Sequence, residues 1–197
     1  MRICIPIREK TAARAISQVK KTDLLLKKWP NSCLEIWLDS FFQPDIERIL
    51  KACKKPVIIV CRGREEKGNF RGTFEEKIEK LKFAVSHGAS FVDIGAHTKS
   101  AHIKELKRFC RKYRAKLIVS THYWDYAPEL AALEKKVLKS KALGADIVKI
   151  AIHVSRWLEN ITLFELTKRM TAKKIPVIIV GMGEKGMLSR IACPLLG

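Results

Sequence analysis

A single lysine interrupts an apolar stretch in the last third of the chain. Lys149 lies within residues 145–152 (ADIVKIAI), which are rich in β-branched residues on both sides of the charge. Such a run is typical of a strand buried on both faces, as in a parallel sheet covered by helices. Burial lowers the pKa of a lysine, and its neutral amine is then a nucleophile at neutral pH. The alternative is a structural lysine that extends from a strand end into solvent.

His122 ends the preceding strand-like run, with a parity that places it on the same face as Lys149. An amine beside an imidazole suits Schiff-base chemistry, in which the lysine forms the imine and the histidine moves protons. A lone histidine at a strand end is more often structural, but the adjacent lysine favours the catalytic interpretation. The other interpretation is a metal site at the strand ends, formed by Asp93, His97, His122 and His153. No HxH or HExxH spacing supports it, so we predict neither a metal nor a cofactor.

These residues belong to a regular alternation of strand and helix patterns. Strand-like runs cover residues 2–7, 33–39, 57–61, 91–95, 116–122, 146–152 and 176–183. Helical patterns cover residues 9–28, 44–54, 73–87, 100–114, 127–143, 159–173 and 184–193. Seven βα units without a linker predict one α/β domain over residues 1–197.

Two α/β folds fit this alternation, an open doubly wound sheet and a (β/α)₈ barrel. A barrel lines its interior with functional groups near the strand C-termini, whereas an open sheet gathers them near one crevice. Here polar residues recur on one face of several strands, at Glu35, Trp37, Asp39, Asp93, Ser120, His122 and Lys149. No GxGxxG follows the first strand, so a dinucleotide site is unsupported. We therefore predict a (β/α)₈ TIM-type barrel with only seven βα units in this chain.

Composition narrows the class of protein further. Hydrophobic residues make up 47% of the chain, so it is expected to fold. No apolar stretch reaches the roughly 20 residues that a membrane-spanning helix needs. We see no signal peptide in residues 1–7. The six cysteines are scattered and form no CxxC motif, and this pattern is typical of the reduced thiols of cytoplasmic proteins. The net charge of +19 is concentrated in helical segments, including residues 99–116. We interpret these segments as solvated outer faces; a nucleic-acid surface is the alternative, without a binding motif to support it.

The ordered motifs of the chain resemble those of the type I 3-dehydroquinate dehydratases of the shikimate pathway. Five segments carry the resemblance, each at the end of an expected strand. Residues 33–39 (CLEIWLD) resemble the family motif E-x-R-x-D, and residues 61–70 (CRGREEKGNF) resemble R-x₃-E-G-G. Residues 119–123 (VSTHY) resemble S-x-H, and residues 144–151 (GADIVKIA) match G-A-D-I-V-K-I-A. Residues 181–190 (GMGEKGMLSR) match M-G-x₂-G-x₂-S-R.

The resemblance implies a hydro-lyase that uses a lysine Schiff base. Lys149 would attack the ketone of 3-dehydroquinate to form an imine, which acidifies the neighbouring C–H. His122 would remove that proton and donate one to the departing hydroxyl, giving 3-dehydroshikimate and water. Glu66 matches the family glutamate that orients the histidine.

The resemblance also implies how the substrate is bound and in what assembly the enzyme works. Arg190 matches the arginine that binds the substrate carboxylate, for which a planar guanidinium is suited. Arg62 and Glu35 match groups that contact the substrate hydroxyls. The family commonly forms homodimers, and a small-molecule substrate is the expected partner.

Four departures from the family pattern leave other functions open. Trp37 replaces the family arginine of the second strand, Lys67-Gly68 replaces paired glycines, and Gly95 replaces an acidic residue. The eighth strand of the family and its glutamine-bearing closing loop have no counterpart before Gly197. This is expected of a fragment, of a barrel that another chain completes, or of a degenerate protein. The alternatives are therefore a non-catalytic remnant that binds through its basic faces, or a class I aldolase with the same lysine.

Overall fold

Strands and helices alternate along the residues that the computed structural model describes, which are 3–42 and 44–196. Over these residues there are seven β-strands and seven α-helices. The chain divides into two units, and each is described by itself. Unit 1 comprises Met1–Ile94 and Lys104–Leu117, and unit 2 comprises Gly95–Ile103 and Ile118–Gly197.

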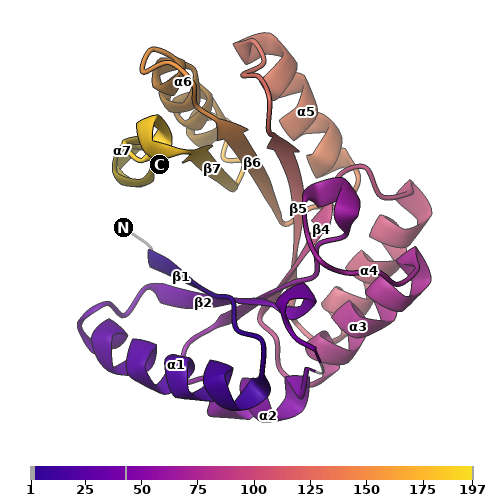
Figure 1. Ribbon diagram of the computed structural model, residues 1–197. Coiled ribbons are helices and arrows are strands. Elements are labelled where there is room, and N and C mark those ends of the chain that lie inside the picture. The colour runs from indigo at the N-terminus through magenta and orange to yellow at the C-terminus, as the bar shows by residue number, and fades with distance from the viewer. Residues whose placement is uncertain (1–2, 43, 197) are drawn as a thin grey trace. The chain divides into compact units, whose positions relative to one another are not determined.

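The strands of unit 1 pair in the order in which they follow one another along the chain (Figure 1). They are β1 (Ile3–Ile7), β2 (Ser32–Trp37), β3 (Val57–Val60) and β4 (Phe91–Gly95). β1 pairs with β2, β2 with β3 and β3 with β4, each pair parallel. A doubly wound sheet reverses its strand order near the middle, whereas a barrel keeps the order of the sequence. The pairing therefore favours the barrel over the open sheet.

Helices cover one face of the unit 1 strands. They are α1 (Ala12–Leu25), α2 (Ile46–Ala52), α3 (Phe74–Ser86) and most of α4 (Ser100–Lys112). α3 begins at a capping box in which Thr73 and Glu76 each accept the other's backbone N–H, and it buries Ile78, Leu81 and Val85 on one side. Such a stripe along a helix is what the 3.6-residue period of its apolar positions predicts.

Unit 2 repeats the arrangement with three strands. β5 (Lys116–Tyr123) pairs with β6 (Ile147–His153), and β6 with β7 (Val177–Met182), again parallel and in chain order. The helices of this unit are α5 (Leu130–Ala142), α6 (Glu159–Ala172) and α7 (Ser189–Leu196). α6 contacts both β7 and α7. Strand–helix alternation in both units confirms the predicted α/β fold with seven βα units.

The second strand ends earlier than the sequence predicted. Residues 33–39 were expected to be extended, but β2 ends at Trp37 and Leu38–Ser40 form a 3-10 turn. Asp39 therefore lies beyond the strand. Its carboxylate accepts the backbone N–H of Arg62 at 3.0 Å and of Asn69 at 3.1 Å. These bonds tie the turn to the loop after β3, and this explains why the chain leaves the strand direction.

The predicted helix boundaries differ from the observed ones at several places, and two of the predicted helices are divided. The predicted helix 9–28 is α1 followed by a 3-10 turn, Leu26–Lys28. α1 begins later than predicted because the Thr11 side chain accepts the backbone N–H of Arg14 and caps the helix start. The predicted helix 184–193 divides into a 3-10 turn, Glu184–Gly186, and α7. Arg2, where the first strand was predicted to begin, lies outside the described residues.

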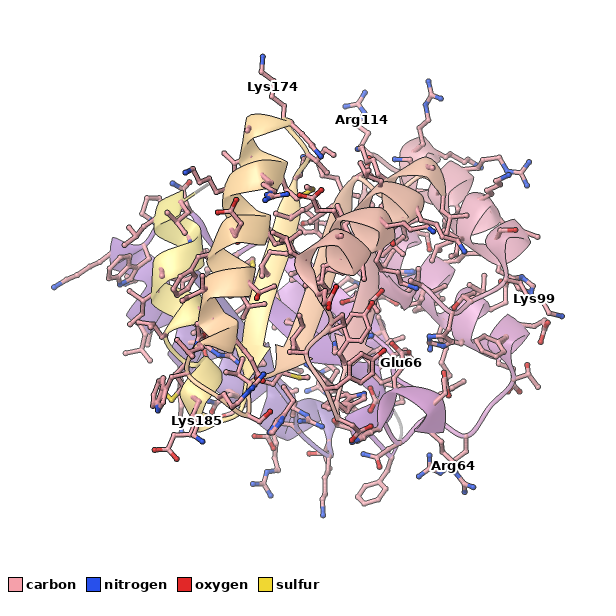
Figure 2. The ribbon with its side chains drawn as sticks, turned by 90° about the horizontal axis from the view of Figure 1, so that it is seen from above. Arg64, Glu66, Lys99, Arg114, Lys174 and Lys185 are labelled. Carbon is pink, nitrogen blue, oxygen red and sulfur yellow. The ribbon has the colours of Figure 1, made fainter. Side chains whose placement is uncertain are left out.

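The basic residues lie on the outer faces of the helices. In α4, Ile103, Leu106 and Cys110 are fully buried, while most of its lysines and arginines are exposed. Lys99, Arg114 and Lys174, which lie just outside the ends of α4 and α6, also extend away from the ribbon, whereas Glu66 is enclosed (Figure 2). This supports the interpretation of the charge as solvated helix faces. Among the described residues, no helix combines the length and the apolar character needed to span a bilayer.

Candidate active site

Lys149 and His122 lie on the same face of two neighbouring strands in unit 2. In the register of β5 and β6, Ser120 is opposite Lys149 and His122 is opposite Ala151. Side chains two residues apart on a strand point to one face, so the amine and the imidazole share a face. Strand spacing and rise place their Cα atoms about 8 Å apart, within reach of both long side chains. The parity predicted from the sequence is therefore correct.

The burial of Lys149 differs from the expectation. Val148 and Ile150 are fully buried, as a strand covered by helices requires. Lys149, which points to the opposite face, is only half-buried, and so is His122. The sequence predicted a lysine enclosed on both sides, because a run of β-branched residues does not distinguish the helix-covered face from the face that carries the polar groups. Partial exposure is what a nucleophile needs if a substrate is to reach it.

Trp124 provides a surface for the histidine ring. The centroids of the His122 and Trp124 rings are 5.6 Å apart, and the ring planes are inclined by only 15°. Aromatic stacking of this kind restricts the rotation of the imidazole and so helps to hold the ring in one orientation. No sequence motif singles out Trp124, because it lies just beyond the end of β5 and its stacking on His122 depends on how the chain turns there.

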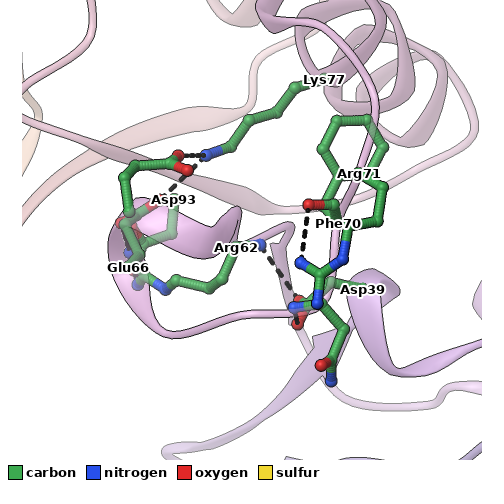
Figure 3. Close-up of polar contacts among 9 residues, drawn as sticks. Asp39, Arg62, Glu66, Phe70, Arg71, Lys77 and Asp93 are labelled. Atoms are coloured by element: carbon green, nitrogen blue, oxygen red, sulfur yellow. Dashed lines mark hydrogen bonds and ion pairs between the residues drawn. The ribbon is translucent and has the colours of Figure 1, made fainter.

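Unit 1 contains a buried cluster of charged side chains (Figure 3). Arg62 donates to Glu66 Oε1 through one terminal nitrogen and to Asp93 Oδ2, at 2.8 Å, through the other. Lys77 Nζ lies 2.9 Å from Glu66 Oε2. Arg62 and Lys77 are each only 2% exposed. We call Arg62, Glu66, Lys77 and Asp93 the charged cluster.

The charges of the cluster compensate one another. Burial alone would lower the pKa of the Arg62 guanidinium, but Asp93 and then Glu66 outweigh it, so that this pKa is raised above its ordinary value. Removing one partner from such a cluster leaves an uncompensated buried charge, which is strongly destabilising. The cluster thus holds the guanidinium in one orientation. Asp93, a candidate metal ligand in the sequence, is here the ion-pair partner of Arg62.

Glu66 is held by cations from two elements. Both of its oxygens accept charged hydrogen bonds, one from Arg62 and one from Lys77 of α3. Each carboxylate oxygen has a second lone pair, so these bonds leave acceptor capacity for a further donor. The predicted role of Glu66 in orienting His122 stays a prediction. Lys77 was not among the predicted site residues, because a lysine within a helical pattern looks like any other solvated charge.

The loop that carries Glu66 is tightly turned. A side chain at Gly68 would collide with the backbone of Arg62, and the Gly68 N–H donates to the Gly63 carbonyl at 2.8 Å. Lys67 adopts a left-handed conformation with φ 58°. The family has glycine at this position, and glycine takes such a φ without the steric cost that a Cβ imposes. Lys67 therefore takes, at a steric cost, a backbone conformation that glycine would adopt freely.

Glu35 and Trp37 are joined on the same face of β2. Trp37 Nε1 donates to Glu35 Oε1 at 2.8 Å, and Glu35 is 8% exposed. Two guanidinium groups lie over the ring of Trp37. The central guanidinium carbon of Arg8 is 4.1 Å from the ring centroid, and the central guanidinium carbon of Arg62 is 5.9 Å from it. The predicted contact of Glu35 with substrate hydroxyls stays a prediction, and its observed partner is an indole N–H.

The motif after β7 positions Arg190 through a buried serine. Ser189 Oγ accepts the Gly181 N–H and donates to the Gly186 carbonyl, both at 2.7 Å. Gly181 and Gly186 are so close that a Cβ on Gly181 would lie 2.7 Å from the Gly186 carbonyl oxygen. The glycines and the serine of the motif are thus structural. Arg190 follows directly, on α7, with an exposed side chain.

The parallel strands pair in chain order, and helices follow them. Polar side chains lie near the C-terminal ends of these strands. This arrangement defines an α/β-barrel enzyme. The sequence model of the type I 3-dehydroquinase family matches residues 3–197. The chain belongs to this family, which is one of hydro-lyases, as the resemblance predicted. The match favours a hydro-lyase over the aldolase alternative.

Individual relatives agree with the family match. A 3-dehydroquinate dehydratase of Dehalococcoides mccartyi is 33% identical over 182 residues, which cover 92% of this chain and 79% of that protein. The bifunctional chloroplastic 3-dehydroquinate dehydratase/shikimate dehydrogenase of Arabidopsis thaliana is 28% identical over 196 residues, which cover 99% of this chain and 32% of that protein. This chain therefore spans about a third of the plant protein's length.

A solved structure confirms the fold. The type I 3-dehydroquinate dehydratase of Clostridium difficile has a TM-score of 0.88 and 22% sequence identity, and the alignment covers 99% of this chain and 80% of that one. The predicted TIM-type fold class is thus correct.

Proposed function

We propose that this chain dehydrates 3-dehydroquinate to 3-dehydroshikimate through an imine on Lys149, a step of the shikimate pathway toward chorismate and the aromatic amino acids. The observation that carries the proposal is the common face of Lys149 and His122 on β6 and β5. Family membership supports the reaction, and the register of the two strands supports the imine route.

The reaction needs two functions from these side chains. The Lys149 amine adds to the C3 ketone and loses water, which forms a C=N bond. The imine acts as an electron sink and lowers the pKa of the C–H at C2, so that the neutral imidazole of His122 can remove this proton. The electron pair of the broken C–H bond forms the new double bond and expels the C1 hydroxyl, which takes a proton from the imidazolium. Hydrolysis of the imine releases the product and restores the amine.

The stack of His122 on Trp124 suits this sequence of steps. The imidazole gains a proton at C–H cleavage and loses it when the hydroxyl departs, so it must be stabilised in its charged form between the two steps. An indole face attracts a cation and repels none of the neutral reactants. We infer that Trp124 lowers the barrier by stabilising the imidazolium as it forms.

Covalent trapping tests the proposal. Incubation with 3-dehydroquinate and borohydride should reduce the imine to a stable secondary amine, located by peptide mass spectrometry on Lys149. Lys149→Ala should abolish both the adduct and turnover while keeping the fold, because it removes an amine without opening a large cavity. Lys116→Ala, at the exposed start of β5, is the matched control and should retain both. Turnover without an adduct on Lys149 would exclude the imine route.

The remaining assignments stay predictions. They are the substrate contacts of Glu35, Arg62 and Arg190, the homodimer, the cytoplasmic location, and the single barrel domain over residues 1–197.

A further inference from the structure

Part of the positive charge lies where the chain leaves each helix of unit 1 and enters the next strand. Residues 26–31 (LKKWPN) precede β2, 53–56 (CKKP) precede β3, 87–90 (HGAS) precede β4, and 112–116 (KYRAK) lead into β5. These four segments contain seven lysines and arginines but neither aspartate nor glutamate. We call Lys27, Lys28, Lys54, Lys55, Lys112, Arg114 and Lys116 the basic edge.

Hydrogen bonds along the sheet hold these segments side by side. Lys55 Nζ donates to the Trp29 carbonyl at 3.2 Å, which joins the segments before β2 and β3. The Ser90 N–H donates to the Val57 carbonyl at 3.0 Å, and the Ser90 carbonyl accepts the Lys116 N–H at 2.9 Å. Neighbouring parallel strands are about 4.8 Å apart, so the basic edge extends over about 14 Å from β2 to β5.

The charge of the basic edge is not compensated within residues 3–42 and 44–196, where no carboxylate pairs with any of its side chains. Asp23 reaches this edge, but its carboxylate is buried and accepts the backbone N–H of Lys54 at 3.1 Å. The outer face of α2 differs, since Lys51 there pairs with Glu47 at 2.6 Å. A concentrated positive charge that the fold leaves uncompensated attracts a polyanion.

Arg114 occupies a backbone position that favours glycine. Its φ is 57°, whereas Gly88 takes the corresponding position after the preceding helix, α3, with φ 101°. This left-handed conformation has a steric cost for a residue with a Cβ, but not for glycine. The Arg114 side chain extends away from the ribbon (Figure 2). Stability alone therefore does not explain the arginine, whereas a role for its charge does.

Two exposed aromatic side chains lie among these cations. Trp29 is 45% exposed and Tyr113 is 42% exposed. The Tyr113 ring stacks on Phe109 with centroids 4.8 Å apart, and Lys112 Nζ lies 5.5 Å from the Tyr113 centroid. Single-stranded nucleic acids bind to such combinations, because their bases stack on aromatic rings while cations contact the phosphates. The bases of a duplex are already stacked on one another and offer no face to a ring.

We propose that the basic edge of unit 1 binds single-stranded nucleic acid, with phosphates on its lysines and arginines and bases stacked on Trp29 and Tyr113. Contacts to phosphates and ring faces carry little sequence information, so the binding is largely independent of base sequence. None of the residues assigned to the dehydration belongs to the basic edge. The two proposals therefore stand or fall independently.

Removing two charges from the basic edge of the full chain tests the proposal. The probe is a fluorescent oligothymidylate of about 20 nucleotides, longer than the roughly 4–16 nucleotides that single-strand binding folds cover. Each phosphate contact contributes about 0.7 to the slope of log K against log salt, hence about 5-fold in affinity at about 0.1 M salt. Lys54→Gln combined with Lys116→Gln should therefore weaken binding roughly 25-fold and reduce the slope by about 1.4.

A second double variant separates the basic edge from net charge. Lys20→Gln combined with Lys104→Gln removes the same charge from exposed positions on α1 and α4 of the same unit. At about 0.1 M salt, charges more than about 10 Å from the phosphates are largely screened, so affinity should stay within about 2-fold of wild type. Equal weakening by the two double variants would mean that only net charge matters and would overturn the proposal. Absence of binding by the wild-type chain overturns it as well.

Replacing Trp29 with alanine tests the single-strand assignment. The variant should bind the oligothymidylate roughly 5- to 100-fold more weakly, while its affinity for a duplex of the same length stays within about 2-fold. Trp157→Ala, which removes an exposed tryptophan from unit 2, is the matched control and should change neither affinity. An unchanged single-strand affinity in Trp29→Ala, or an equal loss for the duplex, overturns the assignment.

Arg114→Gly keeps the test decisive if a double variant fails to fold. Glycine relieves the left-handed backbone, so this variant should have a higher thermal midpoint and yet bind the oligothymidylate about 5-fold more weakly. A more stable variant with wild-type affinity counts against the proposal. Vesicles of phosphatidylserine and phosphatidylcholine provide the last comparison. Tighter binding of the wild-type chain to these vesicles than to the oligothymidylate would overturn the nucleic-acid assignment in favour of a membrane surface.

Discussion

Lys77 Nζ on helix α3 lies 2.9 Å from Glu66 Oε2 on the loop after β3, and both side chains are buried. Arg62 holds the other oxygen of the same carboxylate. Glu66 is therefore fixed by one cation from its own loop and one from the following helix. This anchors the loop to α3 at the residue for which the family resemblance implies a catalytic role.

Replacing Lys77 with methionine should cost stability. The change removes a cation from a buried ion pair and leaves Glu66 with Arg62 alone, so we expect the free energy of unfolding to fall by about 3 kcal/mol. Lys82→Met on the same helix is the matched control. Lys82 pairs with Glu79 and Glu105 near the surface, and its loss should cost no more than about 1 kcal/mol. Urea unfolding of both variants measures the difference, and equal losses would contradict the role assigned to Lys77.

The common face of Lys149 and His122 could be predicted from the sequence, whereas the partners of Glu66 could not. Strand residues alternate strictly between faces, so parity follows from the sequence once the strands are located. The ion pair of Glu66 with Lys77 depends on the path of the loop and on the place where α3 packs. Neither has a period along the sequence. Asp39 shows the same limit, because its bonds to backbone N–H groups at positions 62 and 69 are invisible to any side-chain pattern.

Replacing His122 with alanine should slow turnover by about 10²–10⁴, the usual contribution of an acid–base group. Imine formation with Lys149 should persist, so that the borohydride adduct still appears. His153→Ala is the matched control, since His153 ends the neighbouring strand β6 with an exposed ring. Its loss should leave kcat within a few-fold of wild type. Loss of the adduct in His122→Ala would reassign this residue from proton transfer to positioning of the lysine.

Replacing Lys67 with glycine should stabilise the protein. The backbone at Lys67 is left-handed, with φ 58°, a conformation that costs a residue with a Cβ about 1 kcal/mol. Glycine removes this cost but adds some freedom to the unfolded chain, so we expect a net gain of about 0.5 kcal/mol. Lys67→Ala removes the same side chain and keeps the strain, and it should bring no gain. Thermal unfolding of the two variants decides between strain and side-chain effects. Equal shifts would show that the φ angle is not the cause.

The departure at Trp37 illustrates how a substitution can be located in the sequence before its consequence is known. The motif shows that an arginine is missing from the second strand, but the stack of Arg8 on Trp37 depends on the register of β1 against β2. A register shift of one residue would have turned Arg8 toward the helices. Only the paired strands show that Arg8 and Trp37 lie side by side on one face.

The stability of the protein should fall steeply in alkali because of a buried thiol. Burial is the main cause that raises the pKa of Cys61, from 9.0 to about 12. Below pH 9 the thiol is protonated whether the chain is folded or not, so its contribution to stability is fully present. Above pH 9 the unfolded chain loses this proton while the folded chain keeps it. The free energy of unfolding should then decrease by up to about 1.4 kcal/mol per pH unit until the folded thiol ionises near pH 12.

The Cys61→Ala variant isolates this effect from other alkaline titrations. The variant is less stable at neutral pH because it loses buried volume, but it lacks the thiol slope. Denaturant unfolding at several values from about pH 8 to about pH 11 should show the two stability curves converging above pH 9. Curves that stay parallel over this interval would show that the Cys61 thiol ionises equally in both states, and its burial would then not control the alkaline limit of the fold.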